Sequence, residues 1–110
     1  MSESHIGVLT RLFETIESRR GADAETSYTA KLFSRGRTAI AQKVGEEAVE
    51  VNIAALAEGP DALAAESADL IYHLMVLWAD SGINPERVWD ELIKREGLSG
   101  IEEKRARGEL

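Results

Sequence analysis

Five carboxylates in two short stretches of the chain have the types and spacing of a metal-binding cluster. The stretches read Glu46-Glu47-x-x-Glu50 and Glu66-x-x-Asp69. Residues three or four positions apart share one face of a helix, so an antiparallel pair of helices would bring the two acidic faces opposite each other. Oxygen-only clusters of this kind suit hard divalent cations. We therefore expect these five residues to bind Mg²⁺ or Mn²⁺.

A solvated acidic helix surface is the alternative interpretation of such a run of acids. Apolar residues flank the acids in both stretches, among them Val44, Val51, Leu70 and Ile71. This pattern puts the carboxylates at the border of a packed core, where like charges repel by more than the roughly 0.2–0.5 kcal/mol per pair of an exposed helix. The second acidic stretch on its own helix favours a bound cation over a solvated surface.

Basic residues precede the acids in the chain. Residues 26–45 contain no acid and four bases: Lys31, Arg35, Arg37 and Lys43. A basic patch beside a metal-binding cluster suits a polyphosphate substrate, because the metal bridges phosphate oxygens while the bases hold the rest of the anion. We expect Lys31, Arg37 and Lys43 to bind the substrate.

Length and composition limit the class of protein. The chain has 110 residues, and we expect residues 1–110 to form a single domain. The net charge is −7, and residues 43–69 hold seven acids against one base, so the chain lacks the basic footprint of a nucleic-acid-binding protein. The chain has no cysteine and no uninterrupted apolar stretch near the ~20 residues of a membrane span. These features predict a cytoplasmic protein without disulfides or a membrane partner.

The acidic stretches must be positioned by helices, and no strand-like alternation occurs in the chain. The first stretch lies in a predicted helix over 37–58, ended by Gly59-Pro60. The second lies in a predicted helix over 61–80, with Asp61 as its N-cap. Beyond Asp69 this helix is apolar on nearly every side, which predicts burial all round and indicates a dimer interface that completes the core.

Three further helices follow from apolar periodicity and turn signals. We predict helices over 4–20 with Ser4 as N-cap, over 28–34 with Ser27 as N-cap, and over 84–96 with Asn84 as N-cap. In the last of these, four apolar residues are expected to face inward: Val88, Trp89, Leu92 and Ile93. The charged tail 98–110 would form a short surface helix or fray. The predicted fold is all-α, with four to five helices.

His73 lies four residues after Asp69, on the same helix face. It could hydrogen-bond to that acid or assist at the site. A buried histidine with satisfied hydrogen bonds is the interpretation we favour.

The acidic motifs EExxE and ExxD resemble those of the MazG-like all-α nucleotide pyrophosphohydrolases. More specifically, SYTAKLFSRGRTAIAQKVGEEAVE (27–50) and ESADLIYHLMVLW (66–78) resemble the phosphoribosyl-ATP pyrophosphatase family, and the likeness extends over residues 6–96. The resemblance implies a helical bundle completed by dimerisation. It also implies hydrolysis of the α–β phosphoanhydride of 1-(5-phosphoribosyl)-ATP to the AMP form and pyrophosphate, the second step of histidine biosynthesis. The family's metal ligands map onto Glu46, Glu47, Glu50 and Asp69, and Glu66 completes the motif.

Hydrolysis of a phosphoanhydride needs neutralised phosphate charge and a positioned water. A carboxylate not saturated by metal could accept the proton of that water, and Glu47 and Glu50 are the candidates. Three alternatives stay open or are set aside. A pyrophosphohydrolase of the same fold could act on dUTP or a damaged dNTP, and a helical interaction module would use no catalysis. A di-iron bundle needs Glu-x-x-His pairs, which the spacing of Asp69 and His73 does not supply.

Overall fold

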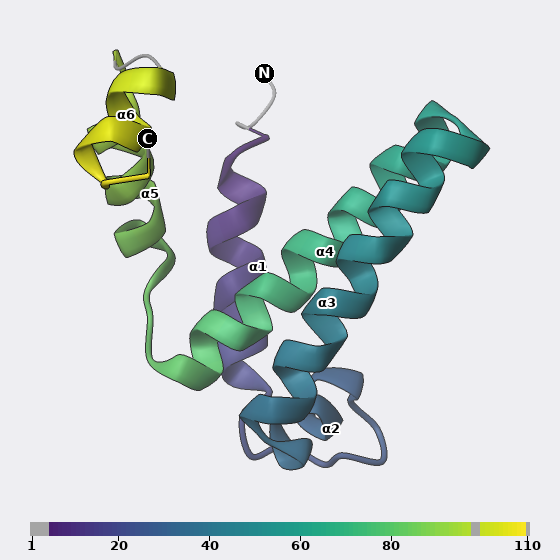
Figure 1. Cartoon of the computed structure of the whole chain (residues 1–110). Helices are drawn as coiled ribbons and strands as arrows, with labels where there is room; N and C mark the ends of the chain where they lie inside the picture. The colour runs from purple at the N-terminus through teal and green to yellow at the C-terminus, as the bar shows by residue number, and fades with distance from the viewer. Residues whose placement is uncertain (1–4, 98–99, 110) are drawn as a thin grey trace.

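The computed structural model describes residues 5–97 and 100–109, with six α-helices and no strand in these ranges (Figure 1). The helices are α1 (Gly7–Ser18), α2 (Tyr28–Arg35), α3 (Arg37–Ile53), α4 (Pro60–Ser81), α5 (Pro85–Arg95) and α6 (Gly100–Ala106). The predicted all-α class is confirmed. The structure has one helix more than the upper expectation because part of the charged tail forms α6. The predicted cap Ser4 lies outside the described residues.

The two acid-bearing helices form one long antiparallel hairpin. α3 continues into a π-helical turn, Ala54–Glu58, and α4 runs back along it (Figure 1). Gly59 connects them with φ +115°, a conformation that side chains with a Cβ rarely adopt. Pro60 then occupies the first turn of α4, where its missing N–H costs nothing. The prediction that Asp61 caps this helix is therefore wrong, because the helix already begins at Pro60.

The hydrophobic core lies at the base of this hairpin, away from its tip. It joins the start of α3 to the end of α4 and takes residues from α1 and α2 as well. The buried members are Phe13, Ile16, Leu32, Ile40, Met75, Val76 and Ala79. Arg37 at the start of α3 also donates to the Asp80 carboxylate at 3.1 Å and to its carbonyl at 3.0 Å. The two long helices are thus fixed to each other at their base.

Two of the predicted helix caps are confirmed. The Ser27 hydroxyl oxygen accepts from the Ala30 N–H at 3.1 Å, and the Asn84 side-chain oxygen accepts from the Glu86 N–H at 2.9 Å. Each satisfies an N–H that has no partner within its own helix. The boundaries of α2 and α5 agree with the sequence pattern to within one residue.

The prediction that Leu92 and Ile93 face inward is wrong for the single chain, whereas the burial of α4 on every side was predicted with a dimer interface in place. Leu92 and Ile93 of α5 are exposed, because this helix packs on the rest through Trp89, whose ring meets Trp78 edge to face at 6.0 Å. Ile71 of α4 is also exposed, so α4 is not buried all round. The apolar pattern gave the face of each helix, but no described part of the chain covers it.

α4 is the one helix among residues 5–97 and 100–109 that is long and apolar enough to cross a membrane by length and composition alone. This helix contains no uninterrupted apolar stretch that would single it out from the sequence, because Glu66, Asp69 and His73 interrupt its apolar residues. Core helices of soluble proteins meet the same criterion. Within the chain, 22% of its most apolar window is buried.

Candidate metal centre

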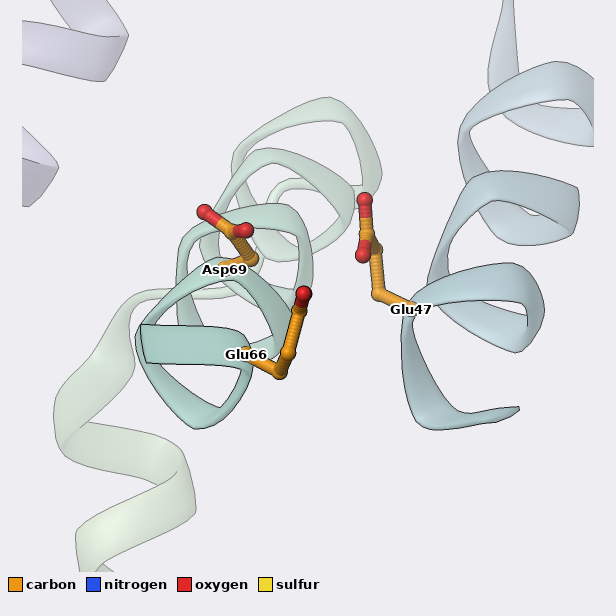
Figure 2. Close-up of side chains that lie close together, drawn as sticks. All are labelled: Glu47, Glu66 and Asp69. Atoms are coloured by element: carbon orange, nitrogen blue, oxygen red, sulfur yellow. The ribbon is translucent and has the colours of Figure 1, made fainter. Parts of the chain in front are cut away.

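Three of the five predicted acids meet across the hairpin. One carboxylate oxygen each from Glu47 of α3 and from Glu66 and Asp69 of α4 lie within 4.8 Å of one another. Figure 2 shows Glu47 reaching from its helix toward the two acids of α4. Glu66 and Asp69 share a face because they are three residues apart, and the antiparallel turn brings that face opposite Glu47. The donor set contains only oxygen, which suits Mg²⁺ or Mn²⁺.

Glu46 and Glu50 lie outside this group of three. Glu46 turns toward its own helix, where Gln42 donates to it at 3.4 Å and the Lys43 ammonium lies 3.7 Å away. Neighbouring residues on a helix point about 100° apart, and Glu47 is the one of this pair that faces α4. Glu50 is exposed on α3, near enough to the cluster to interact electrostatically with Glu66.

Neighbouring carboxylates disfavour the charged form of Glu66. Partial desolvation raises the pKa of Glu66, and repulsion from Asp69, Glu50, Glu47 and Glu58 raises it further. All these causes disfavour the charged form of Glu66. A divalent cation between the carboxylates would relieve the repulsion, so the cluster has the electrostatics of a cation site.

Lys43 is the base that touches the cluster. Its ammonium lies 3.6 Å from a Glu47 carboxylate oxygen. Partial burial acts to lower the pKa of Lys43, but Tyr28, Glu47 and Glu46 outweigh it, so the pKa is raised and the lysine stays charged. Of the other expected substrate residues, Lys31 is exposed on α2, and Arg37 pairs with Asp80 at the base of the hairpin.

His73 is a buried histidine with both ring nitrogens satisfied, as the sequence favoured. It is 5% exposed, and its Nδ1 lies 2.7 Å from the Asp69 carbonyl oxygen. A carbonyl only accepts, so Nδ1 carries the hydrogen, and Nε2 accepts from the Tyr28 hydroxyl at 2.9 Å. His73 therefore bonds to the backbone carbonyl of Asp69, and the carboxylate of Asp69 remains available at the cluster.

Sequence reasoning missed the residues that attach α2 to α4. The Tyr28 hydroxyl bonds to His73, and the next residue, Thr29, bonds through its hydroxyl to the Tyr72 hydroxyl. The neighbouring pairs Tyr28-Thr29 and Tyr72-His73 thus form a double polar contact between the two helices. The signal in the sequence was two adjacent polar and aromatic pairs, but nothing in the sequence shows that residues 45 positions apart would meet.

Replacement of Glu66 by glutamine tests the strain in the cluster. In metal-free protein near pH 7, we expect Glu66→Gln to raise the melting temperature, because the repulsion that the ionised residue suffers is lost. A raised carboxyl pKa means that stability falls as the pH rises through it. The gain should therefore shrink in acid, where wild-type Glu66 is itself protonated. Mn²⁺ affinity should fall roughly 10-fold or more.

Thermal unfolding in EDTA over a pH series, together with Mn²⁺ titration, measures both effects. Glu14→Gln is the matched control, because Glu14 lies on α1 and outside the cluster. A Glu66→Gln protein with wild-type Mn²⁺ affinity would exclude this residue from the metal site.

Comparison with known proteins identifies the family. The sequence profile described as phosphoribosyl-ATP pyrophosphohydrolase matches residues 9–96. A phosphoribosyl-ATP pyrophosphatase of Azospirillum brasilense is 62% identical over 97% of this chain and 98% of its own length. Proteins of the same name from Rhodospirillum rubrum (62% identity, 91% of this chain, 86% of its own) and Caulobacter vibrioides (55%, 97% and 99%) are similar to the chain as well. This protein belongs to the phosphoribosyl-ATP pyrophosphohydrolase family.

Proposed function

We propose that this chain hydrolyses 1-(5-phosphoribosyl)-ATP to 1-(5-phosphoribosyl)-AMP and pyrophosphate, the second step of histidine biosynthesis. The observation that carries the proposal is the 62% identity, over nearly the full length of both chains, to a protein named phosphoribosyl-ATP pyrophosphatase. The three-acid cluster supports it, because cleavage of a triphosphate requires compensation of phosphate charge. The absence of cysteine supports a cytoplasmic location.

The site would hold Mg²⁺ or Mn²⁺ between Glu47, Glu66 and Asp69, with Glu46 and Glu50 as the further acids of the motif. The cation would neutralise phosphate charge and lower the pKa of water in the site. Lys43 stands beside Glu47, where it can hold a phosphate oxygen of the substrate. Lys31 and Arg37 are the further candidates for binding the anion.

Glu50 is the better placed of the two candidate bases. Glu47 belongs to the three-acid group and is paired with Lys43. Glu50 is exposed next to the group but not part of it, so one of its oxygens is available to accept the proton of the attacking water. Glu47 then acts mainly as a ligand, and its loss would impair catalysis through the cation.

The function is tested by pyrophosphate release from purified protein. We expect turnover of phosphoribosyl-ATP with Mg²⁺ or Mn²⁺, loss of turnover in EDTA, and little release from ATP, dUTP or dCTP. Release from a dNTP instead would keep the metal site and move the function to nucleotide housecleaning. Release from none of the substrates would favour a helical interaction module without catalysis.

Glutamine variants separate the base from the ligand. Glu50→Gln should lower kcat by roughly 10²–10⁴-fold and leave Mn²⁺ affinity near that of wild type, because it removes only the proton acceptor. Glu47→Gln should abolish turnover and weaken Mn²⁺ binding, while far-UV circular dichroism reports an intact helical fold. The reverse pattern, with Mn²⁺ affinity lost in Glu50→Gln alone, would exchange the two roles.

We also propose that the chain forms a homodimer through the outer surface of the hairpin. Four large apolar residues there are exposed: Val49, Ile53, Leu56 and Ile71. Leu56, in the π-helical turn at the tip, is 89% exposed. The tip extends beyond α1 and α2, so neither helix covers it (Figure 1). A second copy that buried these residues would complete the core that the single chain leaves open.

Ile53→Glu should weaken the dimer, because it would bury an unpaired charge in the interface. We expect the dissociation constant to rise roughly 100-fold or more, measured by sedimentation across a concentration series. Ile101→Glu is the control, since Ile101 is also an exposed isoleucine but lies on α6. A wild-type chain that sediments as a monomer under assay conditions would contradict the proposal.

A further inference from the structure

The ring of Tyr28 is half exposed to solvent although its hydroxyl is hydrogen-bonded to a buried side chain. The structure describes all six aromatic residues of the chain, and Tyr28, which is 50% exposed, is the only one that is not largely covered. Its hydroxyl is nevertheless held by the buried imidazole of His73 at 2.9 Å. The two rings meet edge to face, at 76° with centroids 5.8 Å apart. The ring is therefore fixed at one end while much of its surface faces solvent.

The position of Tyr28 relates this ring to the metal centre. Its partner His73 is bonded to the backbone of Asp69, one of the clustered acids. Tyr28 also lies within electrostatic range of Lys43, and Lys43 contacts Glu47. Tyr28 thus stands next to the cluster on the side of the phosphate-binding lysine. In a nucleotide, only the ribose separates the base from the α-phosphate, so a base would fall in this region when the phosphates lie at the cluster.

We propose that Tyr28 is the stacking platform for the adenine ring of the substrate, and that His73 fixes its ring for that contact. This inference rests on the proposed function. Aromatic side chains stack on nucleobases through their flat faces, and such a contact is worth most when the ring is already held in place. The hydrogen bond to the buried His73 supplies that preorganisation, and the 50% exposure of Tyr28 leaves ring surface available to a base.

Two crossed variants separate stacking from anchoring. Tyr28→Phe keeps the ring and loses the hydroxyl, whereas Tyr28→Gln loses the ring and keeps a donor for His73. KM for phosphoribosyl-ATP should rise roughly 5-fold or more in Tyr28→Gln and in Tyr28→Leu, with kcat changed much less, because stacking binds substrate and transition state alike. Tyr28→Phe should stay within about 3-fold of the wild-type KM, since the ring remains.

Tyr72→Phe is the control, because it removes a neighbouring hydroxyl from the other ring that meets His73. Its KM should match that of wild type. A wild-type KM in Tyr28→Gln would overturn the inference, whether or not that variant still dimerises. An equal rise of KM in the Tyr28→Phe and Tyr28→Gln variants would overturn it as well. Failure of the wild-type chain to release pyrophosphate would instead overturn the proposed function itself.

Discussion

Repulsion between carboxylates across the α3–α4 hairpin is the constraint on which the rest of the structure depends. Glu47, Glu66 and Asp69 meet at short range, and the raised pKa of Glu66 records the cost. Two helices free to separate would relieve that cost by moving apart. The core at the base of the hairpin and the pairing of Arg37 with Asp80 prevent this. The fold therefore holds three carboxylates at short range at one place, and a bound cation would offset their repulsion.

α2 connects the positive and negative parts of the site. It is attached to α4 by the hydrogen bonds of Tyr28 and Thr29, and its first turn lies next to Lys43 of α3. His73 takes part in this attachment and also bonds to the backbone of Asp69. His73 is buried, and both of its ring nitrogens have hydrogen-bond partners within this attachment. The same residues thus hold α2 in place and fix the turn of α4 that carries Asp69.

The sequence predicted the positions of the helices well, but it predicted less well which of their side chains face a neighbouring helix. Ser27 and Asn84 cap their helices as predicted, because capping is a local interaction. Asp61 does not, since Pro60 begins the helix one residue earlier. Spacing correctly places Glu66 and Asp69 on one face, but it cannot decide which of Glu46 and Glu47 faces α4. That choice depends on how the hairpin packs, and the contact between Tyr28 and His73 depends on it too.

The exposed apolar residues of α5 illustrate a different limit. A periodic pattern identifies the face of a helix that will be buried, but it does not identify what buries it. Leu92 and Ile93 follow the pattern and remain exposed in the single chain, as do Val49 and Ile53 on the hairpin. Local sequence is consistent with burial in each case, so the missing cover must come from outside the described chain or be absent.

The exposed apolar residues of the hairpin and the acid cluster lie on the same two helices, so dimerisation through these residues would couple association to metal binding. If a second chain covers Ile53, it also removes water from the neighbourhood of Glu50, which lies three residues earlier on the same helix. Less water strengthens repulsion among the carboxylates and strengthens their attraction for a cation by the same physics. Without a cation, the stronger repulsion between carboxylates would oppose the dimer. With a cation bound, the stronger attraction between the carboxylates and the cation would favour the dimer. If the chain dimerises in this way, linkage would make metal binding and dimerisation promote each other, since each would be stronger once the other had occurred.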